Sequence, residues 1–262
     1  MIGVLDSNLG GLASVRAISE AFADRDIVYF ADTARGPYSE NSPGAIQSFA
    51  LAGARFLVEQ GARLLAIACH DISSVSPGRA WTEKFRIETI DAIAPMAARA
   101  LAVSRFSRIG VISTPAAVQS GAYEKAIREA SPGAKVYSVA CPLLSPLIRE
   151  GRLKKPETRL ILKKCLQPLK VRQIDTLIAG AADFSLLRDE LARKAGKRVR
   201  IIDPAETLLY SVAGYLEAHA AQEPQPAKNG RVRFCVSDLT ARMEKTAKKM
   251  YGKNVRLEKV DV

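Results

Sequence analysis

The segment Leu64-Leu65-Ala66-Ile67-Ala68-Cys69 is an uninterrupted apolar run that ends in a cysteine. Such a run is typical of a strand that is buried on both faces of a parallel sheet. A second run, residues 175–180, is similar and is followed by Ala181-Ala182-Asp183. Because ligands of open parallel sheets bind at the carboxyl ends of the strands, both ends are candidate parts of one site.

Further short apolar runs alternate with helical segments along the chain. They are residues 2–5, 27–31, 64–68, 87–91, 108–113, 135–139, 176–179 and 199–202. Between them lie amphipathic stretches such as residues 44–60, where apolar residues recur at helical spacing. This alternation predicts an α/β fold with parallel sheets covered by helices.

The two halves of the chain resemble each other, since the units that begin at Ile2 and Ile109 each open with a glycine and a small apolar run. We expect two similar doubly wound domains that face each other across a central cleft; a single larger sheet is the alternative. The first domain is predicted over residues 1–96, completed by 208–220, and the second over residues 97–207. Residues 221–262 are predicted to form a linker and a small basic β-α-β extension, with strands at 231–236 and 255–260 and a helix at 239–250.

The composition excludes several classes of protein. A chain of 262 residues with 48% hydrophobic content can bury a large core. No apolar run reaches the length of about 18 residues that a membrane span needs. The chain opens directly on a strand pattern, so we expect a cytoplasmic protein. Its 4 cysteines lie far apart and only 2 histidines are present, so no metal site or disulfide framework is predicted.

The net charge of +12 is unevenly distributed. Residues 1–100 hold 9 Lys and Arg against 11 Asp and Glu, whereas the remainder holds 30 against 16. A basic surface of this kind can bind a polyanion. No nucleic-acid motif accompanies the charge, so we expect a solvated surface and no nucleic-acid partner, although the basic C-terminal portion keeps that alternative open.

Five stretches in the same order resemble glutamate racemase, the cofactor-independent family that makes D-glutamate for peptidoglycan. They are residues 6–12 (Asp-Ser-Asn-Leu-Gly-Gly-Leu), 29–38 (Tyr-Phe-Ala-Asp-Thr-Ala-Arg-Gly-Pro-Tyr), 67–69 (Ile-Ala-Cys), 113–123 and 140–144. The resemblance covers about residues 1–220 and implies two catalytic thiols, one on each face of the substrate. One thiolate removes the α-proton and the other thiol returns a proton.

The resemblance implies site residues position by position. Its substrate-binding positions are Asp6, Ser7, Pro37, Tyr38, His70, Asp71, Thr114 and Ala182. Its catalytic positions are Cys69 as the first thiol, Glu150 as an assisting carboxylate, and Ala181 and Asp183 where the second thiol and a histidine are expected. No cofactor or metal is implied, and the partner is an amino acid or a related metabolite. Whether the chain forms a homodimer stays open.

The departures from the family pattern gather around the two candidate strand ends. His70-Asp71 stands where Asn-Thr is expected, and residues 181–185 (Ala-Ala-Asp-Phe-Ser) stand where Cys-Thr-His-Tyr-Pro is expected. Ala181 has no proton to exchange, and losing a positioned acid or base costs about 10²–10⁴ in rate. Asp71 and Asp183 also add carboxylates to a site that already holds Asp6 and Glu150.

Four functions follow from this pattern. The first is a family member that is impaired as a racemase and binds a small metabolite in its cleft. The second is a one-thiol isomerase or decarboxylase of the same superfamily that uses Cys69. The third is a working glutamate racemase despite the substitutions, and the fourth is polyanion binding by the basic portion.

Overall fold

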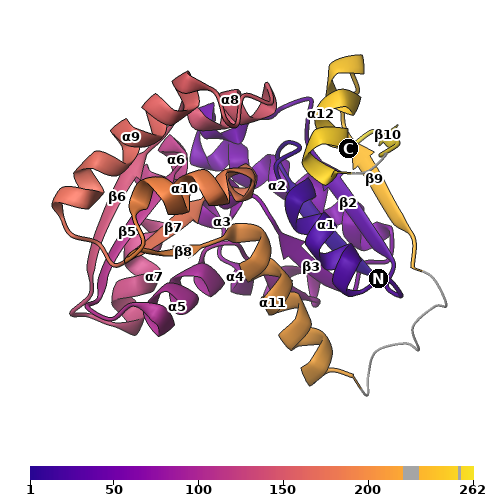
Figure 1. The fold of residues 1–262 in the computed structure, drawn as a ribbon. Helices are drawn as coiled ribbons and strands as arrows, with labels where there is room; N and C mark the ends of the chain where they lie inside the picture. The colour runs from indigo at the N-terminus through magenta and orange to yellow at the C-terminus, as the bar shows by residue number, and fades with distance from the viewer. Residues whose placement is uncertain (221–229, 253–254) are drawn as a thin grey trace.

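The computed structural model describes residues 1–220, 230–252 and 255–262. It contains two parallel sheets, one of six strands and one of four, both covered by helices (Figure 1). The predicted α/β class is therefore confirmed. Of the predicted linker and extension, residues 221–229 and 253–254 lie outside the described residues.

The strand order in the two sheets repeats. The six-stranded sheet runs β10-β9-β2-β1-β3-β4 and the four-stranded sheet runs β6-β5-β7-β8. Their strands are β1 (Ile2–Asp6), β2 (Ile27–Ala31), β3 (Leu64–Ile67), β4 (Glu88–Ile90), β5 (Arg108–Ser113), β6 (Lys135–Ala140), β7 (Thr176–Gly180), β8 (Arg200–Ile202), β9 (Val232–Val236) and β10 (Leu257–Lys259). The order β2-β1-β3-β4 matches β6-β5-β7-β8, so the two halves share one core topology.

Helices follow most strands and return the chain to the start of the next. They are α1 (Leu12–Ala21), α2 (Pro43–Glu59), α3 (His70–Val75), α4 (Gly78–Phe85), α5 (Ala94–Val103), α6 (Pro115–Gln119), α7 (Ala122–Ala130), α8 (Leu144–Arg149), α9 (Pro156–Val171), α10 (Arg188–Ala195), α11 (Pro204–Ala218) and α12 (Ala241–Tyr251), with 3₁₀ turns η1 (Tyr38–Glu40) and η2 (Ala182–Leu187). Within the described residues no helix is both long enough and apolar enough to cross a membrane.

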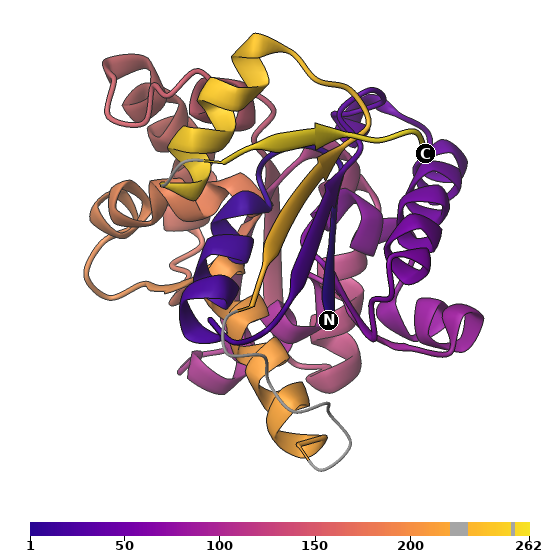
Figure 2. The same ribbon diagram turned by 90° about the vertical axis from the view of Figure 1, so that its right-hand side faces the viewer.

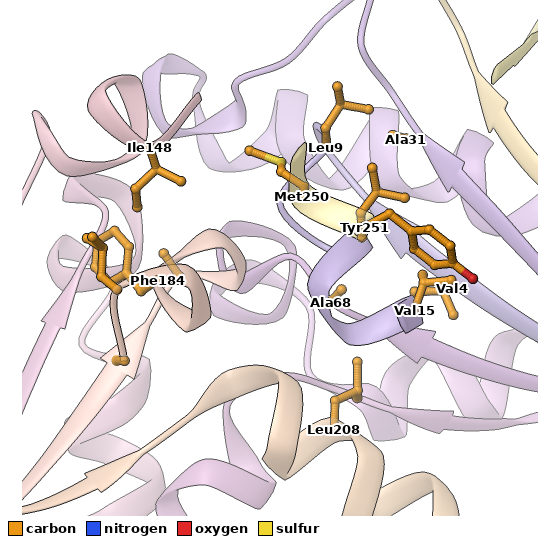
Figure 3. Close-up of a cluster of buried hydrophobic side chains, with 14 of the residues drawn as sticks. Val4, Leu9, Val15, Ala31, Ala68, Ile148, Phe184, Leu208, Met250 and Tyr251 are labelled. Atoms are coloured by element: carbon orange, nitrogen blue, oxygen red, sulfur yellow. The ribbon is translucent and has the colours of Figure 1, made fainter. Parts of the chain in front are cut away.

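The helices form layers on both faces of the six-stranded sheet, with α2 on one side and α1 and α12 on the other (Figure 2). The core on the second side continues into the other half of the molecule. Leu9, Val15 and Met250 belong to the same buried cluster as Ile148 and Phe184, which come from the half that holds the four-stranded sheet (Figure 3). A shared apolar core therefore fixes the two halves against each other.

The β-α-β unit predicted after residue 230 is present, but its strands extend the six-stranded sheet instead of standing apart. β9 pairs in parallel with β2, and β10 pairs with β9. The Phe234 ring contacts those of Tyr29 and Tyr251, with centroids 6.5 and 5.0 Å away. β2 is buried at every position, so the C-terminal unit covers a strand that would otherwise be a hydrophobic edge.

Candidate active site

A cavity of about 150 Å³ lies between the two halves, at the carboxyl ends of their central strands. The strand order reverses between β1 and β3 and again between β5 and β7, which are the points where ligands of such sheets bind. Ten of the residues predicted from the sequence line it: Asp6, Ser7, Pro37, Cys69, His70, Asp71, Thr114, Ala181, Ala182 and Asp183.

Asp6 ends β1 and organises the loop that follows. Its carboxylate accepts hydrogen bonds from the backbone N–H groups of Ser7 (2.8 Å) and Gly11 (2.6 Å) and from the Tyr29 hydroxyl (3.0 Å). A β-carbon at position 11 would lie 2.9 Å from this carboxylate, so the loop requires glycine there. Burial raises the pKa of Asp6 to about 6, although these hydrogen bonds lower it.

Cys69 follows β3 and is held as a neutral thiol. It is buried, and its Sγ donates a hydrogen bond of 3.2 Å to the Ser7 hydroxyl. Burial raises its pKa well above the ordinary range, and the neighbouring carboxylates of Asp71 and Asp6 raise it further. The arrangement therefore favours a proton donor over a thiolate base.

Asp71 and Thr114 join the two halves across the cavity. Asp71 lies in the first turn of α3, Thr114 is the N-cap of α6, and the Thr114 hydroxyl donates a hydrogen bond to the Asp71 carboxylate. Burial raises the pKa of Asp71, while this hydrogen bond lowers it. The Thr114 hydroxyl already has a carboxylate partner from the protein.

The side of the cavity that belongs to the four-stranded sheet carries Ala181 and Asp183. Ala181 follows β7 and presents only a methyl group, whereas Asp183 accepts a hydrogen bond of 3.0 Å from the Ser145 hydroxyl. Burial raises the pKa of Asp183 to about 6, against the lowering effects of Ser145 and Arg149. A β-carbon at Gly10 would lie 3.1 Å from the Asp183 backbone nitrogen, so the N-terminal loop approaches this turn closely.

His70 is the first residue of α3. Among the described residues, it forms no hydrogen bond with Cys69. Its Nδ1 lies 2.6 Å from the Tyr123 hydroxyl, and its Nε2 is buried without a hydrogen-bond partner among the described residues. Burial lowers the pKa of His70 to about 3, so the ring is neutral.

Two predicted site residues lie outside the cavity lining. Tyr38 is buried and donates its hydroxyl hydrogen bond to Asp32. Glu150 follows α8, its side chain is 51% exposed, and it forms an ion pair with Arg242 of α12. In this structure Glu150 contacts the C-terminal unit, not the cavity.

Several further residues line the cavity that were not predicted from the sequence, including Arg149, Ser145, Glu40 and Cys141. Ser145 and Arg149 are four residues apart on α8 and so share one helix face, a spacing that could have identified them. Cys141 is buried, and its Sγ donates a hydrogen bond of 3.6 Å to the Val139 carbonyl.

The lining charges are mainly negative. Asp6, Glu40, Asp71 and Asp183 stand against the single cation Arg149. In the parts of the chain that the structure describes, no three His, Cys, Asp or Glu residues are grouped to hold a metal ion. The cavity therefore offers carboxylates to a ligand at several points and a cation at one.

Comparison with known proteins identifies close relatives. Residues 2–211 match the family described as Asp/Glu/hydantoin racemase. A glutamate racemase of Syntrophus aciditrophicus is 36% identical over 97% of this chain and 93% of its own length. A glutamate racemase isoform of Bacillus anthracis has a similar crystal structure, with a TM-score of 0.93, 31% identity, and coverage of 100% of this chain and 97% of that one. The Francisella tularensis glutamate racemase, solved in complex with D-glutamate, gives a TM-score of 0.90 and 30% identity over 99% and 97% of the two chains.

Proposed function

Because the chain belongs to the Asp/Glu/hydantoin racemase family, we propose that its cavity binds a small amino compound and that glutamate racemisation there is lost or much slowed. The observation that carries this proposal is the pair of residues at the two central strand ends. Cys69 lies at one and Ala181 at the other, in a single cavity.

Racemisation needs a proton acceptor on one face of the α-carbon and a proton donor on the other. Cys69 supplies a thiol from the six-stranded half, but the methyl group of Ala181 exchanges no proton. A missing acid or base of this kind costs about 10²–10⁴ in rate. The raised pKa of Cys69 adds to the loss, since the thiolate is the form that abstracts a proton.

The charges of the cavity support a ligand other than glutamate. The hydroxyl of Thr114, which the resemblance assigns to substrate binding, donates to Asp71 instead. A second carboxylate on the ligand would also face Asp71 and Asp183. Like charges about 4 Å apart at an effective dielectric constant of about 20 cost on the order of 4 kcal/mol. An ammonium group would instead gain from the same two residues.

Reaction in D₂O tests the chemical half of the proposal. The protein is incubated with L- and D-glutamate while α-proton exchange is followed by NMR and optical inversion by circular dichroism. We expect neither exchange nor inversion at a rate typical of the family. Exchange with inversion from both enantiomers would restore the racemase assignment.

Titration calorimetry with three amino acids of equal chain length tests the binding half. Glutamate, glutamine and ornithine carry a carboxylate, a neutral amide and an ammonium group at the same position. We expect affinity to rise in that order at pH 7.5, and Asp71→Asn to reduce the gap between ornithine and glutamate. Tight binding of either enantiomer of glutamate would contradict the proposal.

A one-thiol reaction is the second candidate, because Cys69 is held as a protonated thiol on one face. Such a group suits protonation of a carbanion after decarboxylation or isomerisation. Its signature is α-proton exchange with retention of configuration that Cys69→Ala abolishes. Inversion that Asp183→Asn abolishes would instead show that Asp183 replaces the missing thiol.

A further inference from the structure

The four-stranded sheet carries a second hollow at the end opposite the candidate active site. Its volume is about 520 Å³, within the range of about 300–1,000 Å³ of small-molecule sites. The loop between α5 and β5, the start of β7 and the loop between α10 and β8 form it. Its lining comprises Val103, Arg105, Phe106, Asp175, Lys197, Arg198 and Arg200.

Four cations line this hollow against one carboxylate. Asp175 is already occupied, because it accepts hydrogen bonds of 2.6 Å from the Ser104 hydroxyl and from the Phe106 backbone N–H. No ion pair engages Arg105, Lys197, Arg198 or Arg200 within residues 1–220, 230–252 and 255–262. The cations therefore remain available to an anion, and arginine pairs with phosphate through two hydrogen bonds at once.

Phe106 supplies an apolar surface beside these cations. Phe106 is 74% exposed, the most exposed of the large hydrophobic residues in the described chain. The hydrogen bond to Asp175 fixes its backbone, and Ser107 adopts a left-handed conformation (φ 52°) directly after it. The loop thus holds an aromatic ring in solvent, and packing against other side chains does not offset the free-energy cost of the left-handed backbone conformation.

We propose that this hollow binds a nucleoside di- or triphosphate, with the base stacked on Phe106 and the phosphates on the arginines and Lys197. An exposed aromatic ring next to unpaired cations matches the two chemical parts of such a ligand. The polyphosphate also neutralises the excess positive charge of the lining. The site is separate from the cavity at the carboxyl ends, so it does not depend on the function proposed above.

Three ligands separate the contribution of the base from that of the phosphates. Calorimetry at low salt compares ATP, inorganic triphosphate and adenosine on the full chain. We expect ATP to bind more tightly than triphosphate and adenosine to bind weakest, with affinity falling as salt rises. Equal affinities for ATP and triphosphate would overturn the proposal, since they would leave an anion patch without base recognition.

Matched variants locate the binding. Phe106→Ala is expected to weaken the binding of ATP by about tenfold or more and to leave the affinity for triphosphate unchanged. Arg105→Ala and Arg198→Ala should weaken the binding of both ligands. The controls are Val171→Ala, at an exposed apolar position elsewhere on the surface, and Lys163→Ala, at an exposed cation on α9. Neither control should change the affinity for ATP or for triphosphate. ATP binding that survives Phe106→Ala would overturn the assignment.

Two further outcomes would also contradict it. If a single-stranded oligonucleotide binds far more tightly than ATP and loses affinity with Phe106→Ala, the hollow serves nucleic acid and not a free nucleotide. If the protein is a dimer in size-exclusion chromatography and Phe106→Ala makes it a monomer, the ring belongs to a self-association face. Binding of amino acids in the cavity is measured on the same variants and should stay unchanged in each case.

Discussion

Cys69 shows how neighbouring residues decide what one side chain can do. The thiol donates to Ser7, and burial together with the carboxylates of Asp71 and Asp6 raises its pKa. The carboxylate of Asp71 stands where the family pattern has a hydroxyl group. The substitution therefore acts on the surviving thiol as well as on the ligand.

Asp71→Asn should make Cys69 more reactive. Removing the negative charge lowers the pKa of the thiol, and asparagine keeps an oxygen that can accept from Thr114. We expect the rate of iodoacetamide alkylation at pH 9 to rise by about tenfold, the effect of one pKa unit. Peptide mass spectrometry assigns the label to Cys69. Asp189→Asn, an exposed change in the first turn of α10, is the control, and an unchanged rate in Asp71→Asn would refute the electrostatic argument.

Ala181→Cys should return proton exchange to the second face. The new thiol would lie at the end of β7, in the same cavity as Cys69. We expect α-proton exchange with inversion of glutamate to rise by about 10²-fold over the starting protein. Ala181→Ser has nearly the same shape but a hydroxyl that is a poor acid and base, so it should show no gain. An equal gain in both variants would mean that shape and not acid-base chemistry is limiting.

The sequence predicted the strand-end residues of the site because position along a strand decides which residues reach the cavity. It could not predict the partners of those side chains. The hydrogen bond between Thr114 and Asp71 joins two halves that are packed together only in the folded chain. Arg149 and Glu150 are neighbours at the end of α8, yet one lines the cavity and the other pairs with Arg242, since successive helical residues point about 100° apart.

At the scale of elements, the strands predicted from apolar runs are all present with small differences at their ends. What the sequence could not predict is where β9 and β10 would pair. Local patterns identify a strand but not the strand with which it pairs. β9 lies 205 residues after β2 in the sequence, since Val232 pairs with Ile27. The pairing follows from the burial of β2, whose outer edge would otherwise lack a neighbouring strand.

Phe234→Ala should destabilise the whole first sheet. The ring is buried between Tyr29 and Tyr251, so its loss leaves a cavity between β9, β2 and α12. We expect the free energy of unfolding in urea to fall by about 3 kcal/mol. Arg233→Ala is the neighbouring control: its side chain is 44% exposed and pairs with Glu258, so its loss should cost less than about 1 kcal/mol. Similar losses in both would contradict a packing role for Phe234.

At the scale of the whole molecule, the buried carboxylates of the cavity affect how stability depends on pH. Asp6 and Asp183 each have a pKa raised from 3.8 to about 6. The folded state therefore binds more protons than the unfolded state between pH 4 and 6. Their contribution to stability is complete below pH 3.8 and is lost as the pH rises through 6.

Asp183→Asn isolates this contribution. The amide cannot ionise, keeps an acceptor for Ser145, and still lies beside Arg149. Relative to the variant, the original protein should lose about 3 kcal/mol of unfolding free energy between pH 4 and pH 7, which is two pKa units. Urea titrations at several pH values measure the difference. A constant difference across this range would show that Asp183 ionises as freely when folded as when unfolded.

The pairing of β9 with β2 has a consequence for the protein while it is being made. Ribosomes add about 5–20 residues per second, so the roughly 205 residues between these partners take about 10–40 s to emerge. The four-stranded sheet lies between them in the chain, and its last strand, β8, ends at Ile202, so all its strands emerge before the first sheet receives β9 and β10. A nascent chain therefore exposes the hydrophobic edge of β2 throughout this interval, and chaperones that recognise such edges are expected to act on the first half of the protein.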